Sequence, residues 1–229
     1  MRNDIDGVAF DLDGTLYPNY RLNLRLIPFI LREFPLLLAQ GKARDLLRGK
    51  RPLPKALEPA AAADFYDVQA RYMAFFLKKE PAFIKMRMEE LIYRGWEPLF
   101  RKIKPFPHVR ETLRSIRDGG FRLGLLSDFP PEKKLEYMGL GGLWEVVCCS
   151  ERIGRLKPAA EPFAELARRM GVRPERLLYV GNSLRYDILG ARQAGMQTAL
   201  ICSPLPGKRR SRADFVFHDY RQLGKYVLS

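Results

Sequence analysis

Two aspartates one residue apart follow a short apolar run near the start of the chain. Residues 5–10 predict a buried strand, and residues 11–16 (Asp-Leu-Asp-Gly-Thr-Leu) follow it directly, with Gly14 as the turn that ends the strand. Asp11 and Asp13 would then share one small space, where a cation or a proton must compensate their charges. Mg²⁺ suits such a space because it prefers carboxylate oxygens, phosphate oxygens and water. One aspartate would attack a phosphoryl group while the other transfers protons.

The pattern Asp-x-Asp-Gly also occurs in polar turns and in calcium-binding loops. A calcium loop needs further acidic ligands at fixed spacing, and none follows here at that spacing. Taken alone, the motif is equally consistent with an ordinary polar turn and with a catalytic site. The choice between them therefore depends on the rest of the chain.

The composition indicates one large domain, or a domain with an insertion. The chain has 229 residues, 47% of them apolar, which is enough to bury a substantial core. Three cysteines form neither a disulfide framework nor a zinc motif, and the adjacent Cys148 and Cys149 are expected to be buried thiols.

The N-terminus has no signal-peptide pattern, and residues 22–39, the most apolar stretch, are interrupted too often to span a membrane. We therefore expect a cytoplasmic protein.

Positive charge is concentrated in residues 18–104. The chain has 40 Lys and Arg against 26 Asp and Glu, a net charge of +14, and 18 basic against 9 acidic residues place +9 of it in this segment. Apolar residues recur here at helical spacing, and prolines at 52, 54, 59 and 81 divide the segment into helices of modest length. Such charge attracts nucleic acid, anionic lipid or phosphorylated metabolites, and charge alone does not choose among them.

From residue 105 onward, predicted strands alternate with predicted helices. This alternation predicts right-handed βαβ units and a mostly parallel sheet. The strands are expected at residues 121–126, 145–149, 177–180, 197–201 and 215–217, and the helices at residues 109–118, 130–138, 161–170, 186–194 and after 217.

Residues with phosphate-binding chemistry follow two of these strands. The hydroxyl of Ser127 and the backbone N–H groups beside it, at Asp128, would grip a phosphate oxygen, although a polar turn or helix cap is the alternative. Lys157, ahead of a predicted helix, would offer a fixed positive charge to phosphoryl oxygens, although a single lysine usually lies on the surface.

Residues with metal-binding chemistry follow a further strand. Asn182 and Asp187 supply the oxygens that a hard cation prefers, and a capped helix start is the alternative. Because the carboxyl ends of parallel strands meet at one edge of a sheet, we expect these side chains to converge with Asp11, Ser127 and Lys157.

Taken in order, the four motifs closely resemble those of the haloacid dehalogenase-like hydrolase superfamily. The matching residues are 11–16 for the first motif, 125–128 for the second, Lys157-Pro158 followed by Phe163 for the third, and 181–196 for the fourth. The resemblance implies a Rossmann-like α/β core with a mostly parallel sheet, formed by residues 1–17 and 105–229. It also implies an inserted α-helical cap of residues 18–104.

The resemblance implies a chemical role for the first-motif aspartates. Asp11 would be the nucleophile that forms an aspartyl-phosphate, and Asp13 would protonate the leaving group and then activate water. Because the dehalogenase branch of the superfamily lacks this second carboxylate, Asp13 favours hydrolysis of a phosphate monoester.

The resemblance also implies the residues that bind phosphate and metal. Ser127, with Asp128 beside it, would bind phosphate, and Lys157 would offset charge on both nucleophile and phosphate. Mg²⁺ would be held by Asp11, the backbone carbonyl of Asp13 and Asn182, with Asp187 close by or in the outer coordination shell.

Asn182 departs from the family pattern, which usually has Asp at this position. An amide oxygen still coordinates Mg²⁺ but brings no charge, so we expect a weaker metal site. We hypothesise that Asp187 shifts inward to compensate. A crystal grown with Mg²⁺ in which Asp187 stays behind a water would contradict this hypothesis.

Two functions of different classes remain. The first, which we favour, is a Mg²⁺-dependent phosphatase of a small phosphorylated molecule, drawn in by basic residues such as Arg71, Lys85 and Arg87. The second is a catalytically weakened relative that binds an anionic partner, since residues 22–47 are Arg-rich and amphipathic and suit an anionic membrane or an acidic protein. Basic residues at 48–51 and 208–210 would suit nucleic acid, but no nucleic-acid module is recognisable, so we do not expect that partner.

Overall fold

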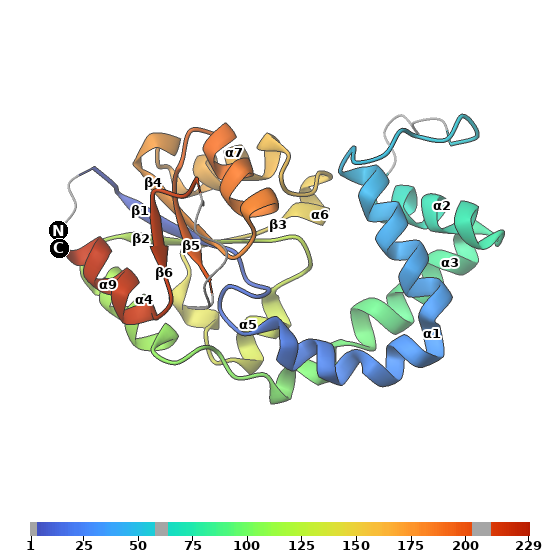
Figure 1. Cartoon of the computed structure of the whole chain (residues 1–229), viewed down its shortest axis with the longest axis horizontal. Helices are drawn as coiled ribbons and strands as arrows, with labels where there is room; N and C mark the ends of the chain where they lie inside the picture. Colours follow the sequence, from blue (N-terminus) through green and yellow to red (C-terminus); the bar gives the residue numbers. More distant parts are fainter. Residues whose placement is uncertain (1–3, 58–63, 203–211) are drawn as a thin grey trace.

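Parallel strands lie side by side in one sheet, in the order β3-β2-β1-β4-β5-β6 (Figure 1). The computed structural model describes residues 4–57, 64–202 and 212–229. The strands within them are β1 (Gly7–Phe10), β2 (Arg122–Ser127), β3 (Val146–Cys149), β4 (Leu177–Gly181), β5 (Gln197–Ile201) and β6 (Phe215–Phe217). The strand order reverses at β1, with β2 on one side and β4 on the other. In open parallel sheets, ligands bind at the carboxyl ends of the strands beside such a reversal.

Helices cover both faces of this sheet. The helices that pack with the first face are α4 (Val109–Asp118), α5 (Glu132–Tyr137), η3 (Gly141–Leu143) and α9 (Tyr220–Leu228). Those on the second face are α7 (Ala160–Met170) and α8 (Leu189–Gln193), and the short turns α6 (Ser150–Ile153), η4 (Pro174–Arg176) and η5 (Leu184–Ile188) connect the strands. Val8 and Phe10 enter the core on the first face, while Ala9 enters the core on the second, as the two-residue period of a strand requires.

The segment between β1 and α4 is helical and has a hydrophobic cluster of its own. Its elements are α1 (Asn19–Leu47), α2 (Phe65–Leu77), α3 (Pro81–Met88), η1 (Glu89–Arg94) and η2 (Glu97–Lys102). Ala43, Met73, Ile84 and Met88 pack together in this cluster. Figure 1 shows α2 and α3 well to one side of the sheet, with α1 running toward them from beside α5.

Helix α1 bends at Glu33, where φ is −118° and ψ is 28°. Pro35 explains the bend, because it donates no N–H and its ring clashes with the carbonyl group four residues earlier. We call residues 19–32 the N-terminal arm and residues 34–47 the C-terminal arm. The C-terminal arm supplies most of the buried residues of α1 and packs on α2, whereas Leu26 is the buried residue of the N-terminal arm.

The structure confirms the expected α/β fold with a parallel sheet, and Cys148 and Cys149 are buried as expected. Each predicted strand agrees with an observed one to within two residues. The helix expected at 186–194 differs: the chain first makes the wide turn η5 and becomes α-helical only from Leu189. The basic residues at 208–210 lie outside the described residues. Across the residues that are described, no helix is long and apolar enough to cross a membrane.

Candidate active site

The side chains expected at the site lie at the carboxyl ends of the three central strands. Asp11 follows β1, Ser127 ends β2, and Asn182 follows β4. Phe10, the last residue of β1, is in register with Leu125 of β2 and Val180 of β4, so the three ends are neighbours. The reversal of strand order therefore places these polar residues together.

A buried ion-pair network joins Asp11, Lys157 and Asp187. Lys157 Nζ donates to Asp11 Oδ1 at 2.6 Å and to Asp187 Oδ1 at 2.7 Å. Burial opposes the charge on Lys157, but the two carboxylates hold its pKa well above the ordinary value, so it remains a cation. Burial raises the pKa of Asp11 to about 7, against the lowering effect of Lys157 and with the help of the nearby Asp187 and Asp13. Thr15 Oγ1 donates to Asp11 Oδ2 at 2.7 Å, so both oxygens of this desolvated carboxylate are oriented.

Asp187 is fixed from three directions. Besides Lys157, the backbone N–H groups of Asn182 (3.2 Å) and Ser183 (2.9 Å) donate to its Oδ2 atom. Gly181 makes room for it, because a Cβ atom there would lie 2.3 Å from the Asp187 Cβ atom. These contacts fold the turn η5 back on the end of β4, which explains why an ordinary helix does not start there.

Asp13 faces a different group of residues from Asp11. Its two carboxylate oxygens accept from Lys134 Nζ at 2.7 and 2.8 Å, and Tyr17 donates its hydroxyl to Oδ1. Lys134 lies in α5 and is largely buried against the rings of Phe100 and Phe129. The expected second carboxylate is thus near the first, but it is held by a lysine of its own.

Ser127 and Asp128, the expected phosphate-binding pair, have different surroundings. Ser127 is fully buried, and its Oγ atom has no hydrogen-bond partner within the described residues, so it is free to bind a ligand oxygen. Asp128 instead accepts from Arg48 Nη2 at 2.7 Å and from the backbone N–H of Lys157 at 3.1 Å. Burial opposes its charge, yet Lys157, Arg44 and Arg48 hold the pKa of Asp128 below its ordinary value. A carboxylate in that state repels phosphate, so only the backbone at Asp128 suits the expected role.

Two arginines, one in the last turn of α1 and one directly after it, join the helical segment to the rest of the fold. Arg44 forms a buried ion pair with Glu151 of α6 and lies over the Phe129 ring, 4.1 Å from its centroid. Arg48, one turn later, binds Asp128 and donates to the backbone carbonyl of Lys157 at 3.1 Å. The C-terminal arm of α1 is therefore fastened beside the second and third motifs.

The oxygen atoms at this site suit a hard cation. In the part of the chain that is described, no three Asp, Glu, His or Cys side chains gather to hold a metal ion, so a metal would also need backbone and amide oxygens. Asn182 supplies an amide group, which lies directly against Gly14 (φ +89°). A Cβ atom built on Gly14 would lie only 2.1 Å from the Asn182 Nδ2 atom. Burial, helped by the nearby Asp187 and Asp13, raises the pKa of Asp11, and a bound cation would favour the charged form of this carboxyl group. The donor set thus fits Mg²⁺, with Asp187 already held by other groups.

Sequence reasoning did not identify Lys134, Arg44 or Arg48 as residues of this site. Nothing in the sequence distinguishes Lys134 from its exposed neighbour Lys133, because the six-residue helix α5 is too short to show a buried face. Arg44 and Arg48 did carry a signal, since residues four apart share one face of a helix.

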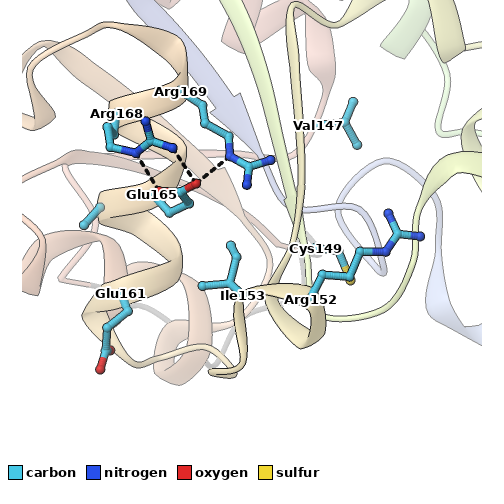
Figure 2. A pocket seen from close by; sticks show the side chains of 9 residues that line it. Val147, Cys149, Arg152, Ile153, Glu161, Glu165, Arg168 and Arg169 are labelled. Atoms are coloured by element: carbon cyan, nitrogen blue, oxygen red, sulfur yellow. Dashed lines mark hydrogen bonds and ion pairs between the residues drawn. The ribbon is translucent and has the colours of Figure 1, made fainter. Parts of the chain in front are cut away.

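A pocket of about 610 Å³ lies beside α6 and α7 (Figure 2). Its arginines are already paired with carboxylates. Arg168 and Arg169 both donate to Glu165, as Figure 2 shows, and Arg152 pairs with Glu132. The pocket contains none of the residues that the motifs predict.

Comparison with known proteins finds sequence similarity to several phosphatases. The chain is 32% identical to the glyceraldehyde 3-phosphate phosphatase of Methanopyrus kandleri over 86% of this chain and 84% of that protein. It is 33% identical to that of Methanocaldococcus jannaschii (94% and 92%) and 29% identical to the phosphoglycolate phosphatase of Escherichia coli (84% and 79%).

Solved structures share the fold at lower identity. A HAD phosphatase from Thermococcus onnurineus superposes with a TM-score of 0.64 at 23% identity, covering 97% of this chain and 98% of that one. The L-2-haloacid dehalogenase of Xanthobacter autotrophicus has a TM-score of 0.63 at 18% identity, with 97% and 98% covered. The family model described as haloacid dehalogenase-like hydrolase matches residues 5–195. Site geometry, motifs and match together show that the chain belongs to the haloacid dehalogenase-like hydrolase family.

Proposed function

We propose that the chain is a Mg²⁺-dependent phosphatase that hydrolyses a small phosphorylated molecule through an aspartyl-phosphate on Asp11. The observation that carries this proposal is the buried network in which Lys157 orients Asp11, with the unpartnered hydroxyl of Ser127 at the end of the neighbouring strand. The phosphatase names of the relatives support a phosphate monoester as the substrate class.

The reaction would consist of two displacements at phosphorus. In the first, an Asp11 oxygen attacks phosphorus, the bond to the leaving oxygen breaks, and Asp13 in its acid form gives that oxygen a proton. In the second, Asp13 takes a proton from water, whose oxygen attacks phosphorus and releases inorganic phosphate and the Asp11 carboxylate. Lys157 and the Ser127 hydroxyl would stabilise negative charge on the phosphoryl oxygens in both steps. Mg²⁺ held by Asp11, the Asp13 carbonyl and Asn182 would add positive charge at those oxygens.

The helical segment would act as a cap that covers the reacting groups. Arg44 and Arg48 hold it beside the second and third motifs, which supports this assignment. The sequence suggested other substrate-attracting residues, but Lys85 pairs with Asp67, and Arg87 pairs with Glu33 and Glu90, within the segment itself. Lys134, beside Asp13, is the better placed cation.

Hydrolysis of p-nitrophenyl phosphate with and without Mg²⁺ tests the proposal. We expect Mg²⁺-dependent turnover that falls at least about a thousandfold in Asp11→Asn, because the nucleophile is lost. Asp6→Asn is the matched control, since Asp6 is an exposed aspartate at the other end of β1 that pairs with Arg176. Turnover that survives in Asp11→Asn, or that ignores Mg²⁺, would contradict the proposal.

A further inference from the structure

The N-terminal arm of α1 is apolar on most of its sides and is scarcely packed. Leu24 is 61% exposed and Leu31 79% exposed, while Leu26 is the arm's buried residue. An apolar face of a helix is normally packed against another element of the fold. The exposed apolar side chains of the arm are therefore not packed against another part of the described chain.

The exposed apolar surface continues across the bend into the C-terminal arm. Large side chains that are 37% to 79% exposed recur along it, at Tyr20, Leu24, Ile27, Ile30, Leu31, Phe34 and Leu38. At roughly 100 Å² each, they expose about 700 Å², whereas the largest apolar patch of a typical monomeric protein is about 300–600 Å². We call these seven residues the α1 patch. A patch of this size marks an interaction surface.

The charges around the patch identify the chemistry of its occupant. Residues 20–38, which carry the patch, contain three arginines, Arg21, Arg25 and Arg32, and one acidic residue, Glu33, which pairs with Arg32 and Arg87. The chain beyond η2 runs alongside the arm, since Arg21 donates to the Lys104 carbonyl at 3.3 Å and Arg25 to the Lys102 carbonyl at 3.4 Å, and both of these lysines are exposed. The apolar patch is thus bordered by positive charges from two segments.

A second copy of the chain would bring the same positive charges to this border, and they would repel. An anionic lipid surface brings opposite charge, and each Lys or Arg near such a surface adds to its attraction. The combination of a large apolar helix face with a basic border is typical of helices that lie in the membrane interface. Charge complementarity therefore favours lipid over self-association.

We propose that the α1 patch docks this protein on an anionic lipid surface, with α1 lying in the plane of the headgroups. Leu24, Ile27 and Leu31 enter the boundary between headgroups and acyl chains. The arginines of the arm extend to the lipid phosphates, as long basic side chains do at membrane interfaces. Docking needs no turnover, so this inference stands or falls independently of the phosphatase chemistry.

Flotation of the full-length chain with lipid vesicles tests the docking. The vesicles are pure phosphatidylcholine and a mixture of phosphatidylcholine with phosphatidylglycerol. We expect the chain to float with the mixed vesicles only, and to be released when salt is raised to about 1 M, where charges are screened within roughly 3 Å. Leu31→Asp should lower the bound fraction at least about tenfold, because it removes an apolar group that would enter the lipid and adds a charge that anionic lipid repels.

Met86→Asp is the matched control, since Met86 is a 57% exposed apolar residue of α3 outside the patch. It should bind like the unmodified chain, and Leu24→Asp should repeat the Leu31→Asp result. Circular dichroism confirms that each variant folds.

Several results would overturn the proposal. They are the absence of flotation, equal flotation with neutral vesicles, and equal losses in Leu31→Asp and Met86→Asp. A fourth is a dimer in analytical ultracentrifugation that Leu31→Asp dissociates and that does not float, because the cover would then be a second copy.

Discussion

At the scale of single residues, Lys134 is the side chain that connects α5 to the first motif. Its Nζ atom contacts both oxygens of Asp13 and is nearly enclosed by aromatic rings, so Asp13 is held in one orientation. In Lys134→Met that restraint is lost, and we expect kcat for p-nitrophenyl phosphate to fall at least about tenfold, because proton transfer needs a positioned group.

Lys133→Met is the control for this prediction. Lys133 is the adjacent residue, carries the same charge and pairs only on the surface, with Glu136 at 3.1 Å. Its kcat should stay unchanged. Equal kcat values for the two variants, at matched thermal stability, would show that Lys134 does not contribute to the active site.

Asn182 is the residue where a charge would strengthen the metal site. It lies against Gly14, beside a network in which burial raises the pKa of Asp11, and it contributes an amide where the family usually has a carboxylate. We expect Asn182→Asp to raise Mg²⁺ affinity about tenfold, about 1.4 kcal/mol, through the added negative charge. Calorimetric Mg²⁺ titration checks this, with the exposed Asn23→Asp as control. Unchanged or weaker affinity in Asn182→Asp would show that residue 182 does not contact the metal.

At the scale of elements, the helix α8 packs directly against the third motif. A Cβ atom at Gly190 would lie 2.5 Å from the ring of Phe163, which is itself fully buried against Tyr179. Gly190→Ala should therefore lower the free energy of unfolding by about 1–3 kcal/mol, despite the better helix propensity of Ala.

Gly41 in α1 is the matched control for Gly190, because a Cβ atom there meets nothing within 4 Å. Gly41→Ala should raise stability by up to about 1 kcal/mol. Urea unfolding of both variants measures these changes. If both substitutions change the free energy of unfolding in the same direction, the close approach of α8 to Phe163 does not make Gly190 necessary for stability.

The elements that the sequence predicted well are those whose pattern is set by burial on both sides. The sheet strands are continuous apolar runs because helices cover both faces, so their positions could be predicted to within two residues. The bend in α1 and the wide turn η5 could not, because each depends on a local conflict. Pro35 interrupts a helix that packing on α2 otherwise continues, and Asp187 bends the chain back to reach Lys157.

The same distinction applies to the candidate site. The motifs placed Asp11, Lys157 and Asp187 correctly at one edge of the sheet, because strand ends of a parallel sheet converge. Lys134 and Glu151 approach the site from elements whose relative placement is set by tertiary packing. The spacing of residues in the sequence could therefore not predict that placement.

At the scale of the whole molecule, a buried ion pair joins the helical segment to the sheet. Arg44 and Glu151 are separated by 107 positions in the chain, and their side chains are 7% and 0% exposed. Breaking such a pair leaves one charge buried without compensation, which is far more costly than losing an exposed pair. This ion pair therefore contributes to the stability of the fold and also holds the candidate cap in place.

Arg44→Met should lower the free energy of unfolding by about 3–5 kcal/mol at neutral pH, because Glu151 loses its partner. Adding Glu151→Gln should recover most of this loss. Arg94→Met is the control: Arg94 and Glu89 form a 2.9 Å ion pair with both side chains more than half exposed, so it should lose less than about 1 kcal/mol.

The loss in Arg44→Met should also depend on pH. Burial raises the pKa of Glu151, although Arg44 lowers it in part. A carboxyl group with a raised folded pKa contributes stability below its unfolded value of about 4.3, and this contribution disappears as pH rises through the folded pKa. Without Arg44 the folded pKa rises further, so the loss should be smaller at about pH 5 than at about pH 8, because buried Glu151 accepts a proton. Urea unfolding at the two pH values measures the difference, and an equal loss at both would mean that Glu151 is not the group left unpaired.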